Sequence, residues 1–160
     1  MKLPILPAVS RMAKSAAAKI ASDRRFTAPK TSDFLADMER LGEDIAEEFK
    51  VTVIENIEEN KYGFELSEST VRRKGSDTPL IDTHQLVDAI YREGTTVSVE
   101  DSPRDDSPLS NKELAIVHEY GVKDHNIPAR PVWRNTFRDF EEVARERIEE
   151  FFDTHKFSKK

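Results

Sequence analysis

Two stretches of the sequence carry an apolar residue every three or four positions, which is the spacing of one face of an α-helix. The first stretch follows Pro29 and predicts a long helix over residues 33–59, with glutamates mostly at the other positions. The second stretch predicts a long helix over residues 131–153. The two stripes consist of Phe34, Met38, Leu41, Ile45, Phe49, Val53 and Ile57, and of Val132 or Trp133, Phe137, Phe140, Ala144, Ile148 and Phe151.

A capping pattern marks a further helix between these two. Ser110 lies three residues before Glu113, and this Ser-x-x-Glu spacing satisfies two backbone donors at the start of a helix. Gly121 supplies a residue that easily adopts the left-handed conformation after a helix end. We therefore expect a helix over residues 111–120. Its apolar side would consist of Leu114, Val117 and Tyr120.

A small sheet is expected from the β-branched residues. Residues 95–100 alternate in polarity and predict a strand with Val97 and Val99 facing the core. A single strand cannot pair its own backbone groups, and residues 62–66 and 121–127 are the expected partners.

Two short helices complete the prediction, over residues 67–73 and 83–91, the second with Asp82 as its N-cap. The fold class that follows is α+β, with a small, mainly antiparallel sheet packed by two long helices. We expect the 160 residues to form one domain over residues 31–160, preceded by an extended arm over residues 1–30. The sequence has no cysteine and no apolar run near the roughly 18 residues of a membrane span, so disulfides and membrane insertion are not expected.

The charge is distributed unevenly between the arm and the domain. Residues 1–30 hold seven basic residues and one acidic residue, a balance of +6. Because the whole chain carries −6, residues 31–160 carry −12. A basic arm can bind an acidic neighbour or nucleic acid, since both reward clustered lysine and arginine. Its candidate contact residues are Arg11, Lys14, Lys19, Arg24 and Arg25.

A proline-flanked segment precedes the second long helix. Pro128 and Pro131 hold the intervening backbone extended, because proline fixes its own φ and restrains the residue before it. We expect this segment, residues 127–131, to be rigid and exposed. Arg130 would then either pair with a neighbour's carboxylates or brace its own chain. Two further interface candidates are Ile127 in this segment and Trp133, which is a core anchor or an interface anchor.

These segments carry a family resemblance. Residues 115–121 (AIVHEYG) and 127–131 (IPARP) resemble the pattern A-x-x-H-E-[FY]-G … I-P-A-R-P of a family of tailed-bacteriophage morphogenesis proteins of the neck and tail-completion region. Residues 73–76 (RKGS) and 79–86 (PLIDTHQL) are similar to a second block of that family, R-K-G-S … P-L-I-D-T-G-x-L. The sequence departs from this block at His84, where glycine is usual, and we expect a changed turn there.

The resemblance implies a structural virion protein that joins the head connector to the tail, as a tail terminator or tail-completion protein. It implies a homo-oligomeric ring, commonly six-fold and sometimes twelve-fold, assembled in the host cytoplasm. The partners would be the connector and the tail tube, with genomic DNA passing through and not specifically bound. The alternative is a nucleic-acid-binding module that uses the basic arm.

Catalytic chemistry has little support in the sequence. No two of the four histidines have the His-x-x-x-His spacing of a helical metal site, and His118 and His125 lie on opposite sides of Gly121. Neither a Gly-x-Ser-x-Gly motif nor a cysteine nucleophile is present. The cations at residues 72–74 lack a glycine-rich phosphate loop, and Lys74 is instead a candidate interface residue. We therefore predict no catalytic site, cofactor or metal.

Overall fold

The computed structural model describes residues 26–27, 31–75, 77–105, 107–154 and 158–159 of the chain. Nearly all of the predicted arm, with Arg11, Lys14, Lys19, Arg24 and Arg25, lies outside the described residues. The described part is α+β, as the sequence predicts. It contains five α-helices, one 3-10 helix and two small antiparallel pairs of strands.

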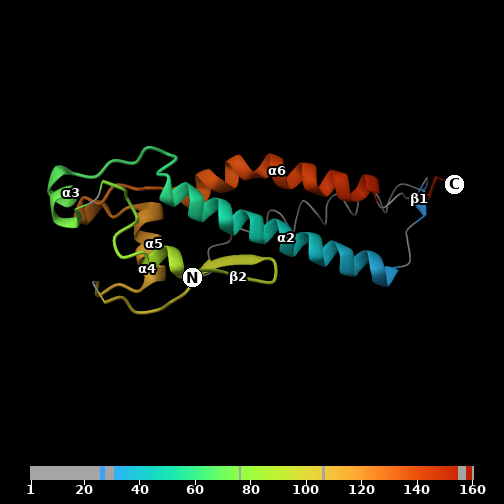
Figure 1. The fold of residues 1–160 in the computed structure, drawn as a ribbon, viewed down its shortest axis with the longest axis horizontal. Coiled ribbons are helices and arrows are strands. Elements are labelled where there is room, and N and C mark those ends of the chain that lie inside the picture. Colours follow the sequence, from blue (N-terminus) through green and yellow to red (C-terminus); the bar gives the residue numbers. More distant parts are fainter. Residues whose placement is uncertain (1–25, 28–30, 76, 106, 155–157, 160) are drawn as a thin grey trace.

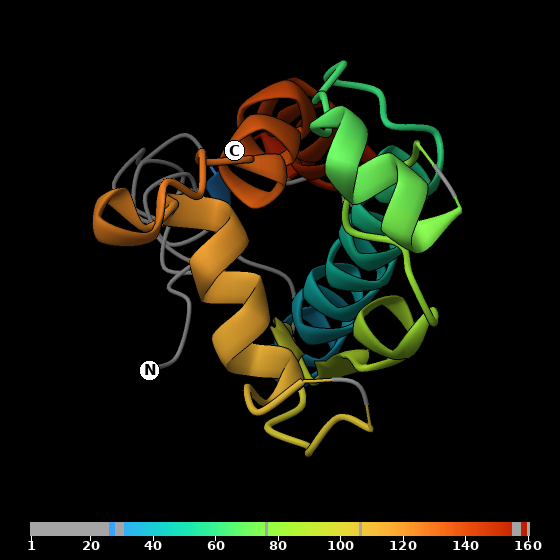
Figure 2. The same ribbon diagram turned by 90° about the vertical axis from the view of Figure 1, so that its left-hand side faces the viewer.

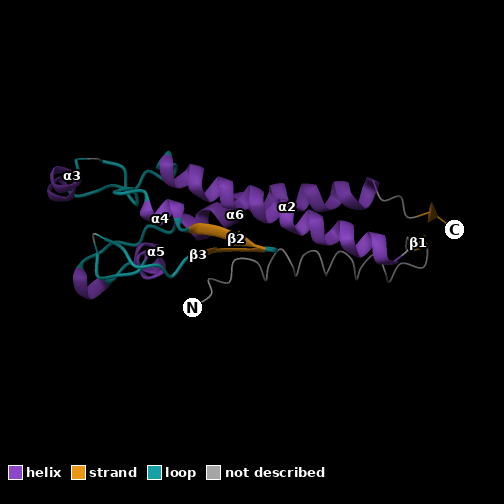
Figure 3. Cartoon of the chain, turned by 60° about the horizontal axis from the view of Figure 1, so that its bottom comes forward, coloured by secondary structure: helices purple, strands orange, loops and turns teal. Residues whose placement is uncertain are grey.

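Two long antiparallel helices form the body of the molecule. α2 spans Thr31–Glu58 and α6 spans Val132–Thr154, so both lie where the apolar stripes predict them. They run side by side along the long axis in Figures 1 and 3. With 28 residues at 1.5 Å rise each, α2 is about 42 Å long. Phe49 of α2 packs edge-on against Phe137 and Phe140 of α6, with ring centroids 6.2 and 5.4 Å apart.

A two-stranded hairpin packs against α2. β2 spans Ile90–Glu93 and pairs antiparallel with β3, Thr96–Val99. The prediction for β3 is confirmed, because Val97 and Val99 are buried in the core. The predicted strand partners are wrong: residues 62–66 form a turn and a loop, and residues 121–127 contribute only an isolated bridge between Val122 and Ile127.

The predicted helix over residues 83–91 is wrong in its second half. α4 spans only Gln85–Asp88, and Ile90 is the first residue of β2 instead. The physical reason is tertiary, since β3 needs a backbone partner and Ile90, opposite Val99, buries its side chain in that pairing. The N-cap position is held by His84, not by Asp82, and His84 has a left-handed φ of 59°.

The shorter helices gather around one end of the α2–α6 pair, as Figures 1 and 2 show. α3 spans Glu68–Lys74 and ends at Gly75 in the left-handed conformation, close to the prediction. α5 spans Asn111–Tyr120, and both hydrogen bonds of its predicted capping box are present. Its apolar side differs from the prediction, because Tyr120 is 49% exposed. The fully buried positions of α5 are Asn111, Ala115 and Glu119.

Two short strands were not predicted. β1, Phe26–Thr27, pairs antiparallel with β4, Ser158–Lys159, which brings the two ends of the described chain together. None of the helices in the described ranges combines the length and the apolar character needed to cross a bilayer.

Candidate functional site

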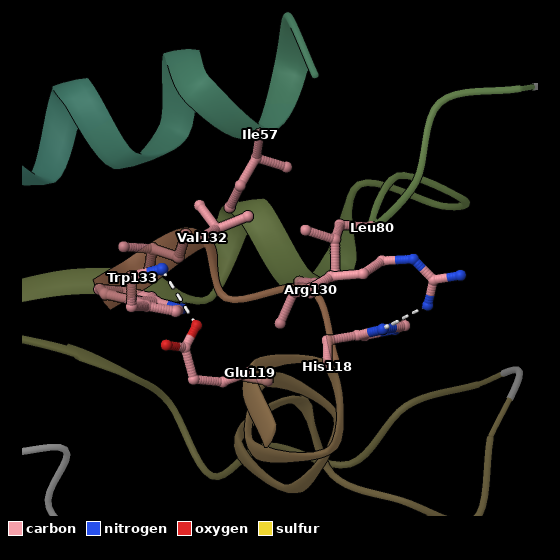
Figure 4. Close-up of a pocket in the computed structure, with 10 residues that line it drawn as sticks. Ile57, Leu80, His118, Glu119, Arg130, Val132 and Trp133 are labelled. Carbon is pink, nitrogen blue, oxygen red and sulfur yellow. Dashed lines mark hydrogen bonds between the residues drawn. The ribbon is translucent and has the colours of Figure 1, made fainter. Parts of the chain in front are cut away.

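The two sequence blocks of the family resemblance meet at one corner, where α5 passes into α6. The chain leaves α5 at Gly121, makes a single 3-10 turn, η1 over Lys123–His125, and returns through the bridge between Val122 and Ile127. The proline-flanked segment then leads directly into α6 (Figure 4). Leu80, from the first sequence block, and His118 and Arg130, from the second, line the same small cavity.

Gly121 allows the chain to fold back on itself at this corner. Its φ is 70° and its ψ is 170°, so it adopts a conformation almost restricted to glycine, and not the left-handed helical one predicted. A Cβ at this position would lie 2.7 Å from the backbone nitrogen of Ala129 and 2.7 Å from the backbone oxygen of Ile127. The close approach of the two backbones therefore requires glycine.

Arg130 is buried, which corrects the prediction that residues 127–131 form an exposed segment. Only 8% of Arg130 is exposed, whereas Pro128 is exposed and Ile127 and Pro131 are half-buried. Its backbone N–H donates to the carbonyl of His118 at 2.6 Å. Its Nη2 donates to the carbonyl of Glu65 at 3.2 Å, and its Nη1 lies 3.5 Å from Nδ1 of His118. Arg130 therefore braces its own chain.

Glu119 caps the start of α6, a role that the sequence did not predict. Its carboxylate is 1% exposed and accepts hydrogen bonds from the backbone N–H of Trp133 at 3.1 Å and of Arg134 at 3.2 Å. Nε of Arg134 donates a third hydrogen bond to this carboxylate, at 2.8 Å. An anion at a helix N-terminus is stabilised by the unpaired N–H groups and by the helix dipole. The hydrogen bonds of Glu119 thus connect the end of α5 to the beginning of α6.

A sequence signal for this cap exists in retrospect. Helices usually begin with Ser, Thr, Asp or Asn at the N-cap position, but α6 is preceded by Arg130 and Pro131. α6 also has no acidic residue in its first turn. Its N–H groups therefore need an acceptor from elsewhere in the chain, and Glu119 in the last turn of α5 supplies it.

His118 is half-buried in a positively charged environment. Burial and, to a smaller extent, the charges of Arg130, Lys74 and Arg104 together lower the pKa of His118 from 6.5 to about 4. The ring of His118 is therefore neutral at pH 7, and an unprotonated Nδ1 can accept a hydrogen bond from Nη1 of Arg130. His118 thus packs against the proline-flanked segment.

Lys74 brings the end of α3 to the same corner. Burial lowers its pKa, the charge of Asp82 raises it, and the charges of Arg130 and Arg73 lower it. Its Nζ donates to the carbonyl of Thr78 at 2.9 Å. The charges of Arg73 and Arg130 both act on Lys74, and we call these three side chains the cationic group.

The cavity at the corner is too small for a substrate. Its free volume is about 10 Å³, which is room for about one water molecule, whereas small-molecule sites usually measure several hundred Å³. Trp133 fills much of this corner and is 5% exposed, so it is a core anchor in the described structure. Within the described ranges, no three acidic or histidine side chains are grouped as metal ligands would be.

Comparison with family models, with curated proteins and with solved structures finds no match to this chain. The geometry of the corner and the two sequence blocks that form it therefore carry the functional inference. The corner holds backbone segments together through buried hydrogen bonds, and it leaves no space for a reacting molecule.

Proposed function

We propose that this chain is a structural, non-enzymatic subunit of a tailed-phage virion. It forms a ring in the neck or tail-completion region and joins the head connector to the tail. The ring is six-fold or twelve-fold, as the family resemblance implies, and its other partners are the connector and the tail tube.

One observation carries the proposal. The two blocks that resemble the phage family are far apart in the sequence, and yet Leu80 of the first block lines the same cavity as His118 and Arg130 of the second. A chance resemblance in two separate segments would not be expected to place their hallmark residues around one cavity. The matching residues also have structural roles: Gly121 allows the backbone crossing and Arg130 braces it.

The departure at His84 is compatible with the resemblance. His84 has a φ of 59°, which lies in the left-handed region that glycine adopts at the least cost. The turn therefore has the backbone conformation that favours glycine, the residue usual in the family. His84 itself adopts this conformation. The histidine therefore does not require the changed turn that we expected from the sequence.

The charge of the domain also fits a passage for DNA. Residues 31–160 carry −12, and a wall that repels phosphates lets a duplex slide without holding it. In this function the basic arm contacts an acidic neighbouring protein and not the genome.

The direct test is inactivation of the gene in the phage that encodes it. We expect full heads and complete tails to accumulate separately, and a plasmid copy of the gene to restore joined particles. Joined, infectious particles formed without the protein would refute the proposal.

The mass of the purified protein, beside a variant that lacks residues 1–30, identifies the part that holds the ring together. A full-length ring that becomes monomeric on truncation assigns the subunit contact to the arm. If the full-length protein and the truncated variant both form rings, the subunit contact lies in the domain, and the arm is free to bind another partner. Monomers in both would mean that assembly requires the connector or the tail as a template, and gene inactivation then decides.

A further inference from the structure

The cationic group, Arg73, Lys74 and Arg130, has no acidic partner in the described part of the chain. The ion pairs there involve other cations, such as Arg72 with Glu68 and Arg92 with Glu47. Asp82 is near enough to influence Lys74, but the two form no ion pair. Three uncompensated cations are notable in a domain whose net charge is −12.

Arg130 is the central member of this group. It is 8% exposed, and its Nε is buried with no hydrogen-bond partner. The hydrogen bonds of its side chain are to neutral groups, the Glu65 carbonyl and the His118 ring. A buried charge is normally paired, because desolvation without a counter-charge is costly. In Figure 4 the side chain of Arg130 runs between Leu80 and His118, away from Trp133.

An acidic stripe on α6 has the complementary chemistry. Four acidic residues repeat at the spacing of one helical face, all are exposed, and none forms an ion pair in the described part. They occupy the last turns of α6, where the helix dipole disfavours negative charge, so a cationic partner would relieve an unfavourable arrangement. The acidic stripe consists of Glu146, Glu149, Glu150 and Asp153.

The two surfaces cannot meet within one chain. α6 begins at the corner with Val132, and Glu149 lies 17 residues further along the helix, which is about 25 Å at the rise of an α-helix. A contact between them therefore requires two molecules. It would join the corner end of one molecule to the far end of α6 in the next, and such head-to-tail contacts close into rings when the rotation is suitable.

We propose that the cationic group is a carboxylate-binding site, occupied by the acidic stripe of a second copy of this chain. The contact rests on the proposed ring and names the surfaces that form it. Arg73 and Lys74 at the end of α3 provide exposed and half-exposed charges, and Arg130 provides a planar donor held rigidly in place.

A charge-swap experiment on the full-length protein tests the contact. One variant carries Arg73→Glu and Lys74→Glu, and the other carries Glu149→Lys and Glu150→Lys. Each variant alone places like charges in contact, so we expect its self-association, measured by sedimentation velocity, to be at least about tenfold weaker than that of the wild type. In an equal mixture every junction between the two different variants is complementary, and association into alternating assemblies should return.

Control variants separate this contact from general charge effects. Arg72→Glu lies on the same helix as the cationic group, and Glu39→Lys lies on an exposed position of α2. Both should associate like the wild type. If a doubly substituted variant is less folded by circular dichroism, Arg73→Glu alone is used, because Arg73 is exposed and makes no ion pair within the described residues.

Three outcomes would overturn the inference. These are a wild-type protein that stays monomeric at low salt, swap variants that associate like the wild type, and a mixture that stays dissociated. The proposed virion function would survive any of them, because head-to-tail joining in the phage is measured independently of the surface that forms the ring.

Discussion

The carboxylate of Glu119 accepts a hydrogen bond from the backbone N–H of Trp133 at 3.1 Å, and this contact joins the end of α5 to the beginning of α6 (Figure 4). Trp133 is also a core residue, so the same position fixes both the start of the helix and the packing of the corner. The buried side chain of Glu119 therefore helps to set the orientation of α5 relative to the α2–α6 pair.

Replacing Glu119 with glutamine should destabilise the protein by about 2–3 kcal/mol. The amide has one acceptor oxygen, and its NH₂ group faces N–H donors that the carboxylate now satisfies. The free energy of unfolding in urea measures the effect. Glu113→Gln, at the exposed capping box of α5, is the matched control and should cost about 1 kcal/mol or less. Equal losses for the two variants would contradict the assignment of Glu119 as the cap of α6.

Replacing Gly121 with alanine should cost more than about 3 kcal/mol or prevent folding of the corner. The new methyl group would lie 2.7 Å from backbone atoms of two residues, and backbone atoms cannot move aside as side chains do. Gly75→Ala is the control, because Gly75 also has a positive φ but has no neighbouring atom within 4 Å of the new methyl. That change should cost about 1 kcal/mol. Thermal unfolding of both variants distinguishes steric exclusion from simple backbone strain.

Stability should fall with acidity in the window set by His118. Its pKa is 6.5 when unfolded and about 4 when folded, so the unfolded chain binds the proton more readily. Its contribution is complete above the unfolded pKa and is lost as the pH falls from about 6.5 to 4, by up to about 3 kcal/mol. Urea unfolding at several pH values measures this slope. His118→Gln should be less pH-dependent in this window, and an unchanged slope would show that other groups cause it.

A buried polar contact couples α2 to α6. Nδ2 of Asn56 donates to Oγ1 of Thr136 at 2.9 Å, and both residues are buried. Thr136→Val should cost about 1–3 kcal/mol, because it leaves the amide without this acceptor. Combining it with Asn56→Leu should cost less than the sum of the single changes, by about 0.5 kcal/mol or more. Strict additivity in this double-mutant cycle would mean that the contact contributes nothing.

The long helices could be predicted from the sequence because their signals are local. The apolar spacing gives α2 and α6, and the Ser110–Glu113 capping box gives the start of α5. β2 could not be predicted in this way, since Ile90 follows a helical turn and becomes a strand residue only through its pairing with Val99. At Ile90 the local preference for a helix is weaker than the need of β3 for a strand that pairs with its backbone groups.

The corner was located from the sequence, but its interior was not. The motif residues identified the place, whereas the burial of Arg130 and Glu119 depends on where Glu65 and the α6 N-terminus lie in space. A proline-flanked arginine is expected at the surface, because extended segments between helices usually run there. Here the segment crosses directly over Gly121, and the absence of a side chain at that residue lets Arg130 reach inward.

The protein composition of purified virions tests the central claim most directly. If this chain joins head to tail, quantitative mass spectrometry of particles from the phage that encodes it should find the chain in every preparation. Its amount should be that of one small ring per particle, far below that of the major capsid protein. Infectious particles that contain none of the chain would contradict the account.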